Sequence, residues 1–237
     1  MESLSIVIPT YNEKKNLIKL SQSIKKYLKL KKYEVIFVDD NSNDGSLEIL
    51  KEIKKNNKKF KYILRKQPIK DLSKSCFMGF KKSSYKNILV MDGDLQHDPK
   101  DINKLIKAYQ RNKADIVVGS RNLFNNKNKG LGFVRLNTSK LLILVVSLML
   151  GKKTNDPMSG FFLFKKKIFI KSAKKMNKIG YKILLDLIYS VNYKIKVVDV
   201  VINFKTRQLG NSKMNFKILI FLIYVIILKF FRKRIIQ

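Results

Sequence analysis

The 237-residue chain has no tryptophan, one cysteine, one histidine and few acidic residues. The single cysteine, Cys76, excludes an internal disulfide framework and fits a reducing compartment. Only 17 aspartates and glutamates face 51 lysines and arginines, so the formal net charge is +34 at pH 7. This charge predicts attraction to anions, and nucleic acid, an acidic lipid surface and phosphorylated substrates all qualify. Internal repeats and Gly/Ser-rich linkers are also lacking, and the length suits one catalytic-sized domain.

Apolar stretches of strand length alternate with helical patterns in the first half of the chain. The expected strands are residues 4–8, 33–39, 60–64, 87–91 and 114–119. Between them apolar residues recur at helical spacing, for example at Leu17, Leu20 and Ile24. Strands that are apolar throughout, separated by amphipathic helices, predict an α/β domain with a mostly parallel sheet flanked by helices.

Polar sequences follow three of these strands: PTYNE after the first, DDNSNDG after the second and DGDLQHDP after the fourth. Ligands of open α/β sheets bind beyond the carboxyl ends of the strands, so we expect the three sequences to meet in one crevice. Asp39 and Asp40 suit turn formation and helix capping, and they equally suit hydrogen bonds to a ribose or a base.

Asp92 and Asp94 are two residues apart at the end of the fourth strand. In an extended backbone their carboxylates project on the same side and can share a cation, with Gln96 adding an amide oxygen. Such an oxygen set predicts Mg²⁺ or Mn²⁺ beside a substrate phosphate, although a turn rich in Asp and Gly is the simpler alternative. We interpret Asp98 as the N-cap of a helix over residues 99–109, and His97 as a bystander.

The second half of the chain is basic and contains two strongly apolar stretches. Residues 141–150 are too few to span a bilayer and predict either a core helix or an interfacial one. Residues 216–237 combine an apolar run with a basic end that includes Lys229, which favours a helix associated with a membrane over a buried helix. Residues 122–133 predict a polar loop. Because a strand is expected from residue 4, we expect no export signal at the start of the sequence.

Six motifs occur in an order that resembles glycosyltransferase family 2, in its dolichol-phosphate mannose synthase and polyprenyl-phosphate sugar transferase branch. They are SIVIPTYNEKKNL, VIFVDDNSNDGS, VMDGDLQHDP, IVVGSRN, DPMSGFFLF and INFKTRQLGNSKMN. The resemblance runs from about residue 4 to residue 215. It implies a GT-A fold over residues 1–214, followed by a hydrophobic and basic membrane-associated segment over residues 215–237.

The resemblance also assigns residues to roles. The implied nucleotide-sugar site consists of Pro9, Tyr11, Glu13, Val38, Asp40, Met91, Asp92, Gly93, Asp94, Arg121, Arg207 and Lys213. The implied metal ligands are Asp92, Asp94 and Gln96, and the implied lipid-phosphate ligands are Arg121, Arg135 and Ser139. Asp92, Asp94, Arg207 and Lys213 are the implied catalytic residues, because they would stabilise the departing nucleoside diphosphate.

The implied reaction is inverting transfer of a hexose, with mannose favoured, from a nucleotide diphosphate sugar such as GDP-mannose to a polyprenyl or dolichyl phosphate at the cytoplasmic face of a membrane. The alternative is another donor, such as UDP-glucose, or a saccharide hydroxyl acceptor. In residues 66–80, Gly79 alone remains of the family's glycine-rich stretch, which leaves the donor open. The absence of tryptophan argues against the processive synthases, whose signature contains one. A nucleic-acid-binding protein is disfavoured, because acidic residues occupy the predicted crevice.

Overall fold

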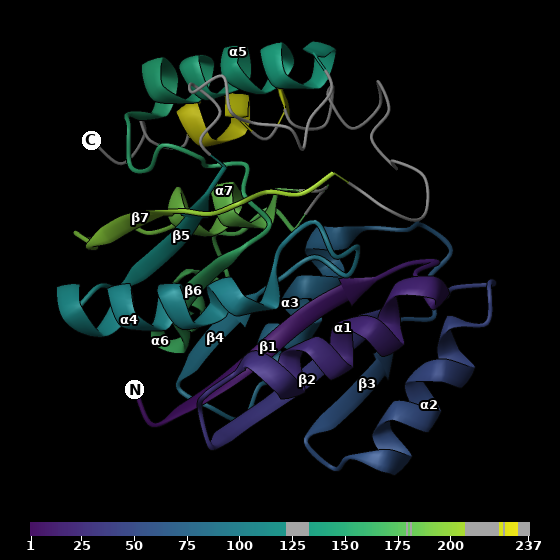
Figure 1. Cartoon of the computed structure of the whole chain (residues 1–237). Coiled ribbons are helices and arrows are strands. Elements are labelled where there is room, and N and C mark those ends of the chain that lie inside the picture. The colour runs from purple at the N-terminus through teal and green to yellow at the C-terminus, as the bar shows by residue number, and fades with distance from the viewer. Residues whose placement is uncertain (122–132, 179, 181, 207–222, 225, 232–237) are drawn as a thin grey trace.

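The computed structural model describes residues 1–121, 133–178, 180, 182–206, 223–224 and 226–231, apart from the side chains of residues 133–135. Within these residues a seven-stranded sheet has the order β3-β2-β1-β4-β6-β5-β7 (Figure 1). The strands are β1 (Ser3–Thr10), β2 (Lys32–Asp39), β3 (Phe60–Leu64), β4 (Asn87–Val90), β5 (Ile116–Ser120), β6 (Phe162–Lys165) and β7 (Val197–Val201).

The sheet is mostly parallel, which confirms the predicted fold class. The exception is β6, which runs antiparallel between β4 and β5. The other neighbouring pairs are parallel. β1 to β5 correspond to the five expected strands, whereas β6 and β7 were not expected. The four residues of β6 are too few for a periodic pattern, and β7 is a half-exposed edge strand of the sheet.

Helices cover both faces of the sheet. They are α1 (Lys14–Tyr27), α2 (Ser46–Asn56), α3 (Leu72–Lys82), α4 (Ile102–Asn112), α5 (Phe133–Leu150), α6 (Lys166–Ser172) and α7 (Ile183–Ile188), with a 3-10 turn η1 (Pro99–Asp101) before α4. Successive strand residues point to opposite faces, so Ile6 and Ile8 pack with α1, α2 and α4 while Val7 packs with α3, α6 and α7.

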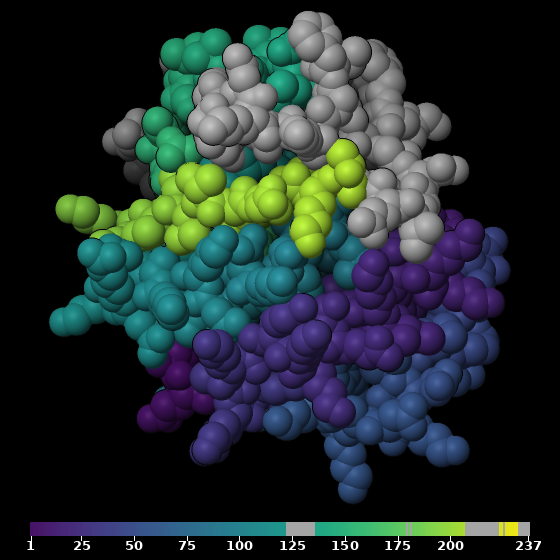
Figure 2. All heavy atoms as spheres, viewed as in Figure 1, coloured from purple at the N-terminus to yellow at the C-terminus, as the bar shows by residue number. Residues whose placement is uncertain are grey.

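A third layer lies at the side of the molecule where β5 and β7 form the edge of the sheet. In it α5 contacts α7 and a helical stretch at residues 223–224 and 226–231, through Val146, Leu150, Met158, Leu185 and Ile226. Figure 1 shows this stretch, in yellow, beside α5, and Figure 2 shows α5 as a green layer beyond β7. The apolar stretch 141–150 is therefore half core and half surface. Its outer face exposes Leu141, Leu144 and Leu148.

The predicted C-terminal segment, residues 215–237, falls mostly outside the described residues. None of the helices that the structure does describe is long and apolar enough to cross a membrane. Lys229, expected in a basic end facing lipid, is instead 2% exposed and forms a 2.7 Å ion pair with Asp186 of α7. The sequence-based prediction for Lys229 was wrong, because sequence spacing could not show that an acidic partner lies beneath the helix.

Candidate active site

The carboxyl ends of β1, β2 and β4 border one open cavity of about 1070 Å³, counting the part that is continuous with solvent. Nine of the residues implied by the resemblance line it: Pro9, Tyr11, Glu13, Asp40, Asp92, Gly93, Asp94, Gln96 and Arg121. The expected crevice at this edge of the sheet is therefore present.

Asp92 and Asp94 lie in a turn rather than in an extended strand. β4 ends at Val90, a turn follows at residues 93 and 94, and Leu95 directly after the two acids has a left-handed φ of 62°. The backbone N–H of Gln96 donates to Asp94 Oδ1 over 3.1 Å. The alternation argument gave the wrong local geometry, yet the turn brings both carboxylates to the same cavity.

Gln96 is held in one orientation by the segment after β7. Its Nε2 donates to the carbonyl of Lys205 over 2.9 Å, and the backbone N–H of Lys205 donates back to the carbonyl of Gln96 over 3.0 Å. With the amide nitrogen fixed on Lys205, the amide oxygen is the end that remains as a ligand. Two carboxylates and one amide oxygen fit Mg²⁺ or Mn²⁺ chemically. No cluster of three or more His, Cys, Asp or Glu side chains suited to a metal occurs among the described residues.

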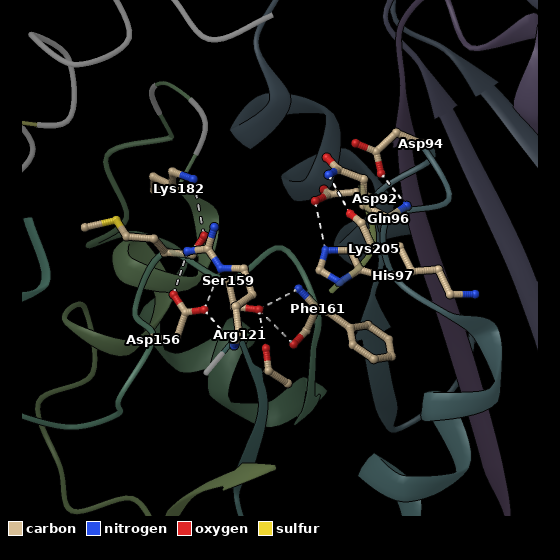
Figure 3. Close-up of polar contacts among 12 residues, drawn as sticks. Asp92, Asp94, Gln96, His97, Arg121, Asp156, Ser159, Phe161, Lys182 and Lys205 are labelled. Carbon is tan, nitrogen blue, oxygen red and sulfur yellow. Dashed lines mark hydrogen bonds and ion pairs between the residues drawn. The ribbon is translucent and has the colours of Figure 1, made fainter. Parts of the chain in front are cut away.

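His97 is more than a bystander, because it contacts Asp92. Its Nε2 lies 3.1 Å from Asp92 Oδ2 (Figure 3). Its ring packs against Phe161 and Phe204, with centroids 5.1 Å away. The other ring nitrogen, Nδ1, is buried and has no hydrogen-bond partner among the described residues. The ring therefore presents one nitrogen to the carboxylate, and its remaining faces are fixed by aromatic packing.

Asp92 stays ionised despite its surroundings. Burial opposes the charge, but the hydrogen bond to His97 and the nearby cations Lys182 and Arg121 outweigh burial and lower the pKa of Asp92. Gly160 lies directly against this carboxylate: a Cβ at position 160 would fall 2.3 Å from Asp92 Oδ2. Because Gly160 has no side chain, there is room for the Asp92 carboxylate.

Arg121 is joined to Asp156 by a buried bidentate ion pair. Its Nε and Nη2 donate to the two carboxylate oxygens over 2.7 and 2.8 Å, and its backbone N–H also donates to Asp156 (Figure 3). The Arg121 side chain is 9% exposed and that of Asp156 is 1% exposed. Although burial disfavours the cation, Asp156 raises the pKa of Arg121, so the guanidinium is charged and rigidly placed at the cavity wall.

On the side of β2, the two adjacent acids have different roles. Asp39 accepts hydrogen bonds from the backbone and side chain of Ser42, as expected of a turn residue. Asp40 lines the cavity, accepts the backbone N–H of Asp71 over 2.7 Å and forms a 2.5 Å ion pair with buried Arg65. Burial raises the pKa of Asp40, and Asp71 and Arg65 oppose that rise.

Several implied site residues are not brought to the cavity or cannot be placed. Val38 and Met91 are fully buried core residues and do not line the cavity. Ser139 lies on α5 and is not among the residues that line the cavity. Arg135 is on the same helix, and the structure does not describe its side chain. Arg207 and Lys213 lie outside the described residues, so their roles stay predictions.

Asp98 has its predicted capping role. Its side chain accepts the backbone N–H of Lys100 over 3.0 Å at the start of η1, and it pairs with Lys205 over 2.7 Å. Other cavity residues were missed by sequence reasoning, namely Thr10, Lys70, Asp71, Leu72, Ser75, Met158, Gly160, Lys182 and Phe204. Met158 and Gly160 belong to the DPMSGFFLF motif, whose position in the sequence was the available signal.

Known proteins resemble this chain in sequence. Residues 5–172 match the sequence model of Glycosyl transferase family 2. A dolichol-phosphate mannosyltransferase of Pyrococcus furiosus is 38% identical over 216 residues, which cover 90% of this chain and 60% of that relative. The chain thus spans less than two thirds of the length of the archaeal protein. The Saccharomyces cerevisiae protein of the same name is 29% identical over 231 residues, or 91% of this chain and 82% of the relative.

Solved structures show the same fold at low sequence identity. Glucosyl-3-phosphoglycerate synthase from Mycobacterium tuberculosis, solved with Mn²⁺, uridine diphosphate and phosphoglyceric acid, has a TM-score of 0.72 at 13% identity. That match covers 97% of this chain and 78% of the other. At this identity the likeness supports the fold alone.

Proposed function

Because the chain belongs to glycosyltransferase family 2, we propose that it transfers a hexose, in the first place mannose, from a nucleotide diphosphate sugar to a polyprenyl phosphate. The observation that carries the proposal is the composition of one cavity. Asp92, Asp94 and Gln96 supply oxygen ligands on one wall, and Arg121 supplies a fixed cation on another. The relatives named dolichol-phosphate mannosyltransferase support the choice of mannose and of a dolichyl-type acceptor.

In the proposed complex, Pro9, Tyr11, Glu13 and Asp40 surround the nucleoside at the ends of β1 and β2. Asp92, Asp94 and Gln96 would hold Mg²⁺ or Mn²⁺, which neutralises charge on the donor diphosphate when bound. The solved mycobacterial synthase with Mn²⁺ and a uridine nucleotide supports a divalent metal in this fold. Arg207 and Lys213 complete the proposed donor site, and Arg135 and Ser139 the proposed acceptor site.

The proposed reaction needs no proton acceptor. A phosphate monoester is already largely dianionic at neutral pH, so its oxygen can attack the anomeric carbon directly. The new bond joins that oxygen to the anomeric carbon, and the bond to the nucleoside diphosphate breaks with its electron pair. Attack from the opposite side inverts the configuration. Catalysis then consists of positioning both substrates and balancing their negative charge, which a fixed Arg121 and a divalent cation held by the carboxylate cluster would do.

We further propose that the third layer rests on the cytoplasmic face of a membrane, with residues 1–214 as the catalytic domain and 215–237 as the membrane-associated segment. Two groups of large apolar side chains are exposed there: Leu141, Leu144 and Leu148 on α5, and Ile223, Tyr224, Ile227, Leu228 and Phe231 on the C-terminal helical stretch. Exposed apolar patches of this kind mark lipid or protein contacts, and a lipid acceptor makes lipid the natural partner.

A donor screen tests the proposal. The purified chain, in detergent with Mg²⁺ or Mn²⁺, is incubated with radiolabelled GDP-mannose, UDP-glucose or other common donors and a short polyprenyl phosphate. We expect mannolipid from GDP-mannose and no product when the metal is chelated. Transfer to a saccharide hydroxyl but not to lipid phosphate would support the alternative acceptor. Absence of transfer from every donor would refute the proposal.

A further inference from the structure

Lys182 is a cavity cation to which no role has been assigned. Its Nζ donates to the carbonyl of Met158 over 3.2 Å, and the side chain lines the same cavity as Asp92, Gly160 and Arg121. Figure 3 shows Lys182 on the Arg121 side of this group, across from Asp94 and Gln96. The ammonium therefore stands on the wall opposite the carboxylate cluster.

The segment that carries Lys182 is tied to the scaffold at several points. The backbone N–H of Gly180 donates to Asp71 Oδ2 over 3.0 Å, and the Gly180 carbonyl accepts the N–H of Ser73 over 2.9 Å. Immediately before it, the N–H groups of Asn177 and Lys178 donate to the carboxylate of Asp186. Lys182 itself is the residue before α7. Its placement is therefore built into the fold, unlike that of a surface lysine.

Lys182 also marks the boundary between the polar cavity and the apolar third layer. Met158, whose carbonyl anchors the ammonium, packs its own side chain with Val146, Leu185 and Ile226 of that layer. A lipid phosphate has an apolar chain and a dianionic head. If its chain lies along the third layer, its head reaches the cavity at this boundary.

The charges in the cavity call for a further cation beside Arg121. Arg121 is held by Asp156 in a buried pair whose net charge is zero. An incoming phosphate dianion also approaches the carboxylates of Asp92 and Asp94, which repel it. The field of Lys182 does reach this region, since it contributes to lowering the pKa of Asp92.

We propose that Lys182 is an acceptor-binding residue that takes the phosphate group of the lipid substrate and, with Arg121, turns one phosphate oxygen toward the anomeric carbon. This inference rests on the proposed function and assigns part of its acceptor site. Lys182 supplies a positive charge and hydrogen-bond donors, and it neither gives up nor takes a proton during the transfer. A role on the donor diphosphate is the competing assignment, and kinetics separate the two.

The test uses Lys182→Met, which keeps an unbranched side chain one atom shorter and removes its charge, and Lys182→Arg, which keeps the charge. Lys74→Met is the matched control, because Lys74 is exposed on α3 and does not line the cavity. We expect Lys182→Met to raise the KM for polyprenyl phosphate about ten- to hundredfold, as loss of a charge-assisted hydrogen bond does. The KM for the donor should stay unchanged, and Lys182→Arg should recover much of the loss. An increase confined to the donor KM, or no change in either KM, would overturn the assignment.

Binding without turnover separates this inference from the proposed function. Calorimetry with farnesyl phosphate and with farnesol measures the phosphate contribution directly. We expect the parent chain and Lys74→Met to bind farnesyl phosphate more tightly than farnesol. Lys182→Met should lose this difference in affinity while its melting temperature stays unchanged. This pattern supports the assignment even if no tested donor gives a product, which alone would refute the proposed reaction. Equal preference for farnesyl phosphate in the parent and in Lys182→Met would refute the role of Lys182.

Discussion

His97 Nε2 lies 3.1 Å from Asp92 Oδ2, and the ring that carries this nitrogen is clamped between Phe161 and Phe204. The contact joins the only histidine of the chain to an acid five positions earlier. Because Asp92 Oδ2 is occupied by the imidazole, Asp92 Oδ1 is the oxygen that can turn toward a cation. The pair thus sets which oxygen of a proposed metal ligand faces the cavity, as partners of metal ligands commonly do.

Replacing His97 with Phe should weaken divalent-metal binding. Phenylalanine keeps the aromatic packing but removes the nitrogen that orients Asp92, and losses of about ten- to hundredfold are usual for such partners. Titration of Mn²⁺ in the presence of a nucleoside diphosphate measures the affinity. Near-ultraviolet circular dichroism checks that the aromatic cluster is intact. An unchanged Mn²⁺ affinity in a folded variant would contradict the orienting role.

Gly160→Ala should impair the site by displacing Asp92. The new Cβ would lie 2.3 Å from Asp92 Oδ2, so the carboxylate has to move. Gly93→Ala is the contrast, because the tightest contact of its Cβ would be with the methyl group of Thr10, at 3.2 Å. We expect sugar transfer by Gly160→Ala to fall at least about a hundredfold, in line with the cost of misplacing a reacting group by about 1 Å. Gly93→Ala should lose much less, and equal losses would show that the contact with Asp92 is not decisive.

Sequence reasoning predicted the features that depend on neighbours along the chain. Apolar runs located β1 to β5, and the spacing of Asp92 and Asp94 located the carboxylate cluster. The Asp98 cap was predictable because capping is local. The turn after Val90 was not, since alternation assumes that the strand continues.

The missed features depend on contacts between distant segments. Arg121 and Asp156 are 35 positions apart, and no local pattern pairs them. Likewise, Lys229 looked like one charge of a basic end until its partner Asp186 was located in another helix. In a chain with so many lysines and arginines, sequence alone cannot tell which few cations are buried.

The Arg121–Asp156 pair should be important for stability as well as for the site. Asp156→Asn leaves the buried guanidinium without its anionic partner, which typically costs about 3–5 kcal/mol of unfolding free energy. The Lys165–Asp115 pair has the same 2.7 Å separation but side chains 28% and 23% exposed, so Asp115→Asn should cost about 1 kcal/mol or less. Urea unfolding of the two variants measures the difference. Similar losses would mean that burial of the first pair has little energetic effect.

The Lys229–Asp186 pair should hold the C-terminal helical stretch against α7. The two side chains are 1% and 2% exposed, and Lys229 also donates to Ser190 Oγ. Lys229→Met alone leaves the buried carboxylate of Asp186 without its cationic partner, whereas the double variant with Asp186→Asn removes both charges. We therefore expect the single variant to be less stable than the double variant, with faster amide exchange in residues 226–231. Strictly additive losses in a double-mutant cycle would contradict a direct interaction.

The stability of the fold should depend on pH through Glu34, a residue that does not line the cavity. Its carboxylate is 4% exposed and accepts hydrogen bonds from Ser5 Oγ, the backbone of Ser84 and Lys61 Nζ. Burial opposes ionisation, but these contacts prevail and lower the pKa of Glu34 below its ordinary 4.5. A carboxyl whose pKa is lower in the folded state stabilises the fold above its unfolded pKa, and this contribution is lost as the pH falls through the folded value.

Glu34→Gln should therefore reduce the free energy of unfolding by about 1–3 kcal/mol at neutral pH, the range for hydrogen bonds to a charged group. The deficit should shrink as the pH falls from 4.5 through the lower folded-state pKa of Glu34, because the carboxyl of the folded parent protein is protonated there. Glu52→Gln, at an exposed position of α2, is the control and should change little at any pH. Urea titrations between pH 3 and pH 7 follow both variants. A deficit of constant size across that range would show that Glu34 acts through packing and not through its charge.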